Sequence, residues 1–405
     1  MMAADRSPAR HEEAVVDERH PWPGLVPFRE AYSRFFFGRS LEQEELLRSI
    51  RRGITTLLFG ESGLGKTSLL QAGLFPRLRE NGYLPVLVRL DYAAEALPPS
   101  EQIKRLLNQA IADAGLDASR RIEPQETLWE YFHRRELALV DRSGEPIIPI
   151  IVFDQFEEFF TLGLNQRKAD CQIFLSELSD LTENRPPAAV KARLERSPDQ
   201  IVRYVFNRDD YRIVITLRED FLPALEMFRT SAPSLGRNRF RLTRMKGPQA
   251  LQAVVEPGRG IVSEEVAWRI VSLVGGGPAN DVSLEANKDI EVEPSLLSLF
   301  CSELNERRLA ADQAEITAEL VERSRRDILR SFYERALNDQ PQAVREFVED
   351  QLVTDFRRPR QHCARTCRTP SGRQRRAGER HRRARATPPA AHRGTARGTA
   401  RRAHP

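Results

Sequence analysis

The sequence predicts an α/β fold, in which a parallel sheet with helices on both faces is followed by a helical lid domain and a disordered basic tail. A glycine-rich loop within Thr55–Leu70 joins a short apolar run to a segment of helical periodicity. Two later apolar runs, Ile147–Phe153 and Tyr211–Leu217, end abruptly in charged residues. Strand and helix patterns alternate between these runs, which is typical of a parallel sheet covered by helices.

The glycine-rich loop has the spacing G-x-x-x-x-G-K-T, which suits phosphate binding. Its glycines let the backbone wrap closely, so that successive N–H groups point at phosphate oxygens, and the following helix adds the positive end of its dipole. Lys66 is expected to reach the β- and γ-phosphates, and the hydroxyl of Thr67 to hold Mg²⁺. The residues expected to bind ATP or ADP are Gly60, Glu61, Ser62, Gly63, Leu64, Gly65, Lys66, Thr67 and Ser68.

Three carboxylates follow the apolar run Ile147–Phe153. A continuous apolar run indicates a central strand buried on both faces, and its carboxyl end lies at the edge where open α/β sheets bind ligands. Asp154 is therefore expected to hold Mg²⁺, directly or through water, as a Walker B carboxylate. Glu157 or Glu158 is expected to orient and polarise the attacking water. The sequence leaves the choice between them open, and we favour Glu158.

Arg218 follows the apolar run Tyr211–Leu217 directly. A cation at the carboxyl edge of the sheet can sense the γ-phosphate or stabilise charge that develops on it. The alternative is that Arg218 only pairs with Glu219, Asp220 or the Walker B acids, and exposed pairs of that kind contribute little stability.

The chain is expected to divide into several parts. Residues 1–20 are charged, lack hydrophobic periodicity and are expected to form a flexible arm. The P-loop NTPase domain spans residues 21–238 and includes a strand at Tyr83–Leu90. The helical lid domain spans residues 239–338. Pro21–Phe37 is dense in proline and aromatic residues, so it either packs on a neighbouring surface or covers the base of the nucleotide.

Charge is distributed unevenly along the chain. Residues 357–405 contain sixteen arginines, no lysine and one acid, which gives +15. Because the whole chain carries a formal +5, residues 1–356 carry −10. An acidic body argues against an intrinsic nucleic-acid surface, so nucleic acid is expected to bind only through the basic tail.

The tail, residues 357–405, has no aliphatic side chain larger than alanine apart from proline, and no aromatic residue other than histidine. Such a segment has nothing apolar to bury and is expected to be disordered. It is either a basic arm that binds nucleic acid or an acidic partner through counterion release, or the product of a frameshift near Phe356. Abundant arginine without lysine favours the frameshift, because a GC-rich gene read in the wrong frame yields this composition.

Several other features bear on the compartment. No apolar run approaches the ~18–20 residues of a membrane span, and the first twenty residues lack the apolar core of a signal peptide. The four cysteines, Cys171, Cys301, Cys363 and Cys367, are too few and too scattered for a disulfide framework. We therefore expect a cytoplasmic protein with no membrane partner.

The motifs occur in an order that resembles the STAND class of signal-transduction ATPases, and within it the bacterial group called novel STAND NTPase 1. The resemblance runs from about Trp22 to Asp355. It is carried by GLVPF at 24–28, FFGR at 36–39, GESGLGKTSLLQAGLFPRL at 60–78, VFDQFEEFF at 152–160, TLREDF at 216–221 and VEPSLLSLFCSELNERR at 292–308.

The resemblance implies an ATP-dependent switch that is closed with ADP at rest, and is bound to ATP and often self-associated when triggered. Gly38 and Arg39 would lie near the adenine, Pro294 would be the lid proline that packs against the base, and Arg218 would be the sensor. Members of the class continue through a winged-helix domain, of which residues 339–356 would be the incomplete start, into repeats that sense a signal. The sequence identifies no sensor or effector partner.

These observations predict a slow, Mg²⁺-dependent P-loop ATPase whose nucleotide state controls conformation and assembly. Hydrolysis would proceed by attack of water on the γ-phosphate. Two alternatives belong to other classes. One is a nucleic-acid-associated loader ATPase, which the acidic body does not favour. The other is an inert truncated fragment that binds nucleotide and transmits no signal.

Overall fold

The computed structural model describes residues 15–228, 230–277, 284–324 and 327–328. The expected start of a winged-helix domain at 339–356 and the basic tail at 357–405 lie outside the described residues. No helix in the described part of the chain is long and apolar enough to cross a membrane. Cys171 and Cys301, the two cysteines within it, are buried free thiols.

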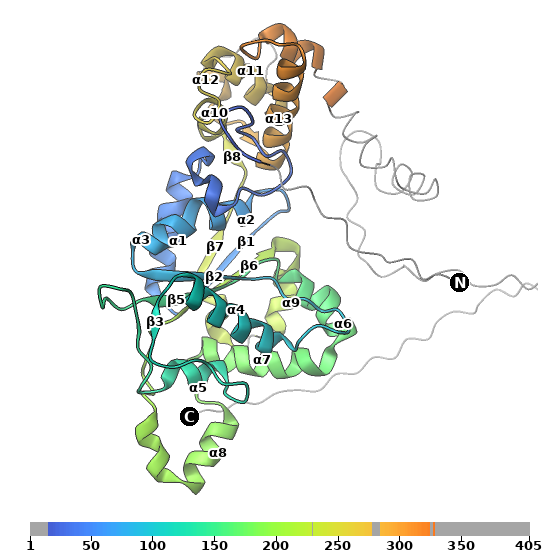
Figure 1. Cartoon of the computed structure of the whole chain (residues 1–405). Coiled ribbons are helices and arrows are strands. Elements are labelled where there is room, and N and C mark those ends of the chain that lie inside the picture. The colour runs from blue at the N-terminus through green and yellow to red at the C-terminus, as the bar shows by residue number, and fades with distance from the viewer. Residues whose placement is uncertain (1–14, 229, 278–283, 325–326, 329–405) are drawn as a thin grey trace, which may run out of the picture. The chain divides into compact units, whose positions relative to one another are not determined.

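A five-stranded parallel sheet forms the centre of the domain that precedes the helical lid (Figure 1). Its strands are β1 (Thr55–Gly60), β2 (Tyr83–Val88), β5 (Ile148–Phe153), β6 (Arg212–Arg218) and β7 (Arg239–Arg241). They lie in the order β2-β5-β6-β1-β7, and every pair is parallel. The α/β fold with a parallel sheet is therefore confirmed, and β6 separates the P-loop strand β1 from the Walker B strand β5.

The central strands are buried on both faces because their side chains alternate between two apolar cores. Ile151 and Ile213 belong to a core that also contains α4 (Pro99–Asp113), α5 (Leu128–His133) and α7 (Lys168–Thr182). Ile150, Val152 and Val214 point to the opposite core. Helices therefore cover both faces, as the sequence predicts.

The second core is closed by α1 (Ser40–Arg52) and by the helix that follows the P-loop. That helix consists of α2 (Lys66–Ser68), a wider π-helical turn at Leu69–Leu74, and α3 (Phe75–Glu80). The shorter elements of this domain are β3 (Asp117–Ala118), β4 (Leu139–Val140), α6 (Leu164–Gln166), α8 (Ala188–Arg196) and α9 (Leu222–Leu225).

A helical lid follows the sheet and has an apolar core of its own. Its elements are α10 (Gly247–Val255), α11 (Glu264–Gly275), α12 (Leu284–Asn287), α13 (Pro294–Ala310) and a two-stranded ribbon of β8 (Met245–Lys246) and β9 (Glu291–Val292). The sheet continues through β7 to Arg241, past the boundary expected at residue 238, because β7 pairs with the buried strand β1.

The N-terminal segment differs from the expectation of a flexible arm over residues 1–20. Residues 1–14 lie outside the described residues, but Val16 is buried and the carbonyl of Arg19 accepts a hydrogen bond from Asn305 in α13. Trp22, expected within the sheet domain, belongs to the core of the lid, and its indole donates to the carbonyl of Ala253. Apolar burial and a buried amide therefore fix this segment to the lid.

We predict that Ile151→Ala lowers the free energy of unfolding by about 2–5 kcal/mol, because it leaves a cavity at a fully buried position of β5. Ile173→Ala is the matched control, since Ile173 on α7 is 67% exposed and should change stability by no more than about 0.5 kcal/mol. Urea unfolding followed by circular dichroism measures both variants. Equal stability changes in the two variants would contradict the position assigned to β5.

Candidate nucleotide-binding site

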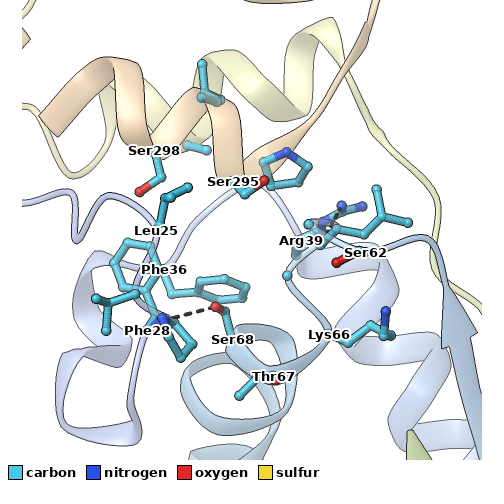
Figure 2. Close-up of a pocket in the computed structure, with 18 of the residues that line it drawn as sticks. Leu25, Phe28, Phe36, Arg39, Ser62, Lys66, Thr67, Ser68, Ser295 and Ser298 are labelled. Atoms are coloured by element: carbon cyan, nitrogen blue, oxygen red, sulfur yellow. Dashed lines mark hydrogen bonds between the residues drawn. The ribbon is translucent and has the colours of Figure 1, made fainter. Parts of the chain in front are cut away.

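A cavity of about 340 Å³ lies where three separate parts of the chain meet. They are the segment after Trp22, the carboxyl ends of the sheet strands with the P-loop, and the first turns of α13. Figure 2 shows Leu25, Phe28 and Phe36 on one side, Ser62 and Lys66 on the other, and α13 across the top. The cavity therefore combines an apolar wall with a polar wall that contains the P-loop.

The P-loop has the backbone geometry that its glycines predict. Gly63 and Gly65 have φ angles of +79° and +80°, in the left-handed region that favours glycine. A Cβ atom on Gly63 would lie 2.6 Å from Oε1 of Glu293 and 2.7 Å from Oγ of Ser295. The carbonyl of Gly63 also accepts a hydrogen bond of 3.2 Å from the backbone N–H of Ser295. The loop is thus in direct contact with the start of the lid helix α13.

Of the P-loop residues expected to bind nucleotide, those from Ser62 to Ser68 line the cavity. Gly60 and Glu61 do not: a Cβ on Gly60 would lie 2.5 Å from the carbonyl oxygen of Leu242, and the carboxylate of Glu61 pairs with Arg244. Both act through their carbonyls, which accept hydrogen bonds of 2.9 and 2.8 Å from Nζ of Lys66. Desolvation by burial lowers the pKa of Lys66, against the attraction of Glu157 and Asp154.

Asp154 is the most heavily bonded group on the polar wall. Its side chain is 1% exposed. Thr67 donates to both of its carboxylate oxygens, at 3.1 and 2.9 Å, and the hydroxyl of Thr216 donates to Oδ1 at 3.0 Å. Arg89 donates to Oδ2 through Nε at 3.1 Å and through a terminal nitrogen at 2.7 Å. The helix after the P-loop, the residue after β2 and strand β6 thus all donate hydrogen bonds to the one carboxylate that follows β5.

The turn after Asp154 is held by the neighbouring strand β6. Gln155 has a φ angle of +60°, a left-handed conformation that is uncommon outside glycine. Its backbone N–H donates to the hydroxyl of Thr216 at 3.0 Å, and the N–H of Phe156 donates to the carbonyl of Thr216. These two hydrogen bonds hold the turn that leads from Asp154 to Glu157 and Glu158.

Thr67 and Asp154 together fit a magnesium ion. They place a hydroxyl and a carboxylate, the oxygen donors that Mg²⁺ prefers, side by side on the cavity wall. No cluster of three or more histidine, cysteine or acidic residues that could hold a metal alone occurs in the part of the chain that the structure describes. A magnesium ion here would therefore take its remaining ligands from nucleotide phosphates and water.

Glu157 and Glu158 lie in different surroundings. Glu157 lines the cavity, and its Oε2 is buried without a hydrogen-bond partner. Glu158 instead lines a small separate hollow beside Tyr92 and Phe156. Burial raises the pKa of both carboxyls, and the nearby charge of Glu157 raises that of Glu158 further. The geometry therefore favours Glu157 over Glu158 as the catalytic carboxylate, because only Glu157 of the two lines the cavity.

Arg218 ends β6 and lines the cavity. Its guanidinium forms an ion pair with Asp220, with hydrogen bonds of 3.1 and 2.7 Å, and its side chain is 41% exposed. Arg218 thus lies where a sensor of the γ-phosphate is expected, and it also forms the ion pair with Asp220 that a purely structural role would require. An exposed pair of this kind is weak enough for Arg218 to exchange partners.

Arg39 lines the cavity, but its donors are used within the protein. The side chain is almost fully buried and donates to Glu42 at 2.6 Å, to the carbonyl of Leu64 at 3.3 Å and to the carbonyl of Thr243 at 2.9 Å. Desolvation lowers the pKa of Arg39, and its bond to Glu42 opposes that change. Arg39 therefore links α1 to the P-loop and to the connection into the lid.

Gly38 does not line the cavity. A Cβ atom at Gly38 would lie 2.3 Å from the carbonyl oxygen of Gln249 in α10, so glycine is required here by the close approach of the lid. Pro294 is the first residue of α13 and lines the cavity. Ser298, one turn further along α13, also lines it, and its hydroxyl oxygen is buried without a hydrogen-bond partner.

Sequence reasoning missed Arg89, Thr216 and Ser298. The expected strand Tyr83–Leu90 placed Arg89 inside the sheet, whereas β2 ends at Val88 and leaves Arg89 at its carboxyl edge. Thr216 is a threonine within a run of aliphatic residues, and that polar interruption was the available signal. Ser298 carried no signal, because serine is common on helices.

Solved structures resemble this chain only distantly. A Walker-type ATPase of Pyrococcus abyssi is 18% identical with a TM-score of 0.47, over 80% of this chain and 79% of that chain. Cdc6p from Pyrobaculum aerophilum is 15% identical with a TM-score of 0.43, over 78% and 72%. The Orc1 protein of Aeropyrum pernix, solved in complex with DNA, is 14% identical with a TM-score of 0.46, over 83% and 77%. No curated protein sequence matches significantly.

A family profile gives a more specific result. The profile of novel STAND NTPase 1 matches residues 21–272, which is more than half of the chain. The match includes the segment after Trp22, the P-loop, the Walker B strand β5 and the strand β6 that ends in Arg218. The chain belongs to the novel STAND NTPase 1 family of P-loop ATPases.

Proposed function

We propose that this protein is a signal-transduction switch that binds ATP or ADP with Mg²⁺, hydrolyses ATP slowly, and changes its conformation and assembly with the nucleotide. The single observation that carries the proposal is that one cavity is lined jointly by the P-loop and by the first turns of the lid helix α13. A nucleotide in this cavity would contact the sheet domain and the lid at once. A change of nucleotide can then change the position of the lid.

Two sets of hydrogen bonds between the lid and the sheet domain support this coupling. The backbone N–H of Ser295 in α13 donates to the carbonyl of Gly63 in the P-loop. Glu42, which accepts from Arg39, also accepts hydrogen bonds of 2.9 and 3.1 Å from the side-chain amide of Gln249 in α10. The first joins the P-loop to α13 directly, and the second joins α10 to α1 and reaches the loop through Arg39, which donates to the carbonyl of Leu64. Movement of the P-loop on nucleotide binding or hydrolysis would therefore change the position of the lid helices.

The polar wall supplies the groups that ATP hydrolysis needs. Lys66 would bind the β- and γ-phosphates after exchanging its bonds to the carbonyls of Gly60 and Glu61. Thr67 and Asp154 would hold Mg²⁺, which neutralises phosphate charge when bound. Glu157 would accept a proton from the attacking water, since its side chain lines the same cavity and its buried Oε2 has no hydrogen-bond partner in the protein. Arg218 would stabilise charge on the γ-phosphate.

The apolar wall suits a nucleobase. Leu25, Val26 and Phe28 line it, and Phe28 and Phe36 pack edge to face with ring centroids 5.6 Å apart. The backbone N–H of Phe28 donates to the hydroxyl of Ser68, which fixes the segment on the helix that follows the P-loop (Figure 2). Pro294 would pack against the base from the lid side. Of the two interpretations of Pro21–Phe37, this arrangement favours the one in which the segment covers the base.

Self-association in the ATP state and an effector or sensor partner are also part of the proposal. They follow from the family and not from a surface of the described residues. Size-exclusion chromatography with light scattering, in ADP and in a slowly hydrolysed ATP analogue, tests the first. A mass that is the same in both nucleotides would contradict assembly of this chain by nucleotide alone.

We predict that Lys66→Ala weakens ATP binding by about 100-fold or more, because the partly buried triphosphate loses the positive charge of the lysine that neutralises it. Isothermal calorimetry measures the affinity. Lys246→Ala is the matched control, since Lys246 is exposed, pairs with Glu291 and does not line the cavity. Unchanged ATP affinity in Lys66→Ala would overturn the proposed site.

We predict that Glu157→Gln slows ATP hydrolysis by about 100-fold or more while ATP binding is retained, because the amide cannot accept the proton of the attacking water. Glu158→Gln should hydrolyse ATP at close to the parental rate, since Glu158 faces a separate hollow. Single-turnover hydrolysis with excess enzyme measures both. The opposite ranking of the two variants would return the catalytic role to Glu158.

We predict that Arg218→Ala keeps ADP affinity within about twofold and weakens ATP affinity by about tenfold, because its partner would be the γ-phosphate. In a Glu157→Gln background, ATP and ADP should give different hydrogen-exchange protection in α13, and adding Arg218→Ala should remove the difference. Arg241→Ala is the control, because Arg241 pairs with Glu219 and does not line the cavity. Equal losses of ATP and ADP affinity would place Arg218 in a structural ion pair instead.

A further inference from the structure

Arg89 is a cation on the cavity wall to which neither the family nor the proposed function gives a role. It follows β2, which ends at Val88, and β2 pairs with β5 so that Val88 lies opposite Phe153. The next residues on the two strands are Arg89 and Asp154, and the N–H of Asp154 donates to the carbonyl of Val88. Strand register therefore places the guanidinium beside the Walker B carboxylate.

The contact occupies one oxygen of that carboxylate. Both Arg89 hydrogen bonds go to Oδ2 of Asp154, at 3.1 and 2.7 Å, and Thr67 donates to the same oxygen at 2.9 Å. Oδ1 accepts from Thr67 and Thr216. Thr67 has one hydroxyl hydrogen to share between the two oxygens, so with two hydrogens from Arg89 and one from Thr216 four hydrogens meet the four lone-pair positions of the carboxylate. A metal ion that binds Asp154 directly has to displace one of these donors.

Arg89 can leave the carboxylate at lower cost than Thr216 can. Its side chain is 46% exposed, whereas Thr216 is almost fully buried and also holds the turn at Gln155. A half-exposed guanidinium that leaves the carboxylate can be solvated by water. Arg89 also lines the cavity, so its positive charge stays near any metal held by Asp154. The two positive charges repel each other, so Arg89 lowers the affinity of the site for the metal ion.

We propose that Arg89 competes with Mg²⁺ for the carboxylate of Asp154 and thereby makes metal binding depend on the γ-phosphate. This inference rests on the proposed nucleotide site. ATP offers the metal more negatively charged oxygens than ADP does, so a carboxylate already neutralised by Arg89 takes up Mg²⁺ with ATP but binds it weakly with ADP. Arg89 is in this sense a positioning residue, which acts on the metal through Asp154.

The test measures metal binding and does not depend on hydrolysis. Mn²⁺ is the probe, and its binding to the complex of the full chain with the fluorescent nucleotide mant-ADP is followed by electron paramagnetic resonance. Arg89→Gln should tighten Mn²⁺ binding roughly tenfold, because a positive charge next to the metal is removed. Arg89→Lys keeps the charge and should stay near the parental value, and Arg241→Gln, outside the cavity, should match it.

The outcomes separate this inference from the proposed function. Mn²⁺ affinity that is unchanged or weaker in Arg89→Gln, with mant-ADP still bound, would overturn the competition and leave the nucleotide site intact. Failure of mant-ADP to bind the parental chain, with or without metal, would overturn both. Tighter Mn²⁺ binding in Arg89→Gln and Arg89→Lys alike would also overturn it, because the effect would then not arise from charge.

Discussion

The burial of one charge, the carboxylate of Asp154, is the constraint on which the rest of the site depends. A carboxylate that is 1% exposed is costly unless donors surround it, and here they come from Thr67 at the start of the helix after the P-loop, Arg89 just after β2 and Thr216 in β6. These hydrogen bonds join the carboxyl end of β5 to β6, to the residue after β2 and to the helix after the P-loop. The carboxylate proposed to hold Mg²⁺ is thus also the group whose hydrogen bonds hold the polar wall together.

Sequence reasoning succeeded where a local pattern has one structural outcome. The glycines of the P-loop and the doubly buried run Ile147–Phe153 each predicted the element that is observed. Reasoning failed where the outcome depends on which strands are neighbours. Arg89 is remote from Asp154 in sequence, and only the pairing of β2 with β5 brings them together. The choice between Glu157 and Glu158 likewise depends on which of them lines the cavity, which residue types alone do not specify.

The roles of Arg39 and Trp22 illustrate a second limit. A buried arginine near a P-loop suggests a ligand, yet Arg39 gives its hydrogen bonds to Glu42, Leu64 and Thr243. Trp22 precedes the sheet domain in the chain, yet it belongs to the core of the lid. Packing between segments far apart in the sequence determines the positions of both residues, and hydrophobic periodicity within a short window cannot predict such packing. The distribution of polar and apolar residues along the chain fixed the layers but not these connections.

The attachment of the N-terminal segment to the lid has a consequence for the order of folding. Trp22 bonds to Ala253 across 231 positions of sequence, and Arg19 bonds to Asn305 across 286. Contacts of such separation close long loops, and neither can form before both of its partners have been synthesised. During synthesis the first residues of the described chain must wait for the lid helices before they can be buried. The cavity wall that they form is therefore among the last parts of the molecule to be completed.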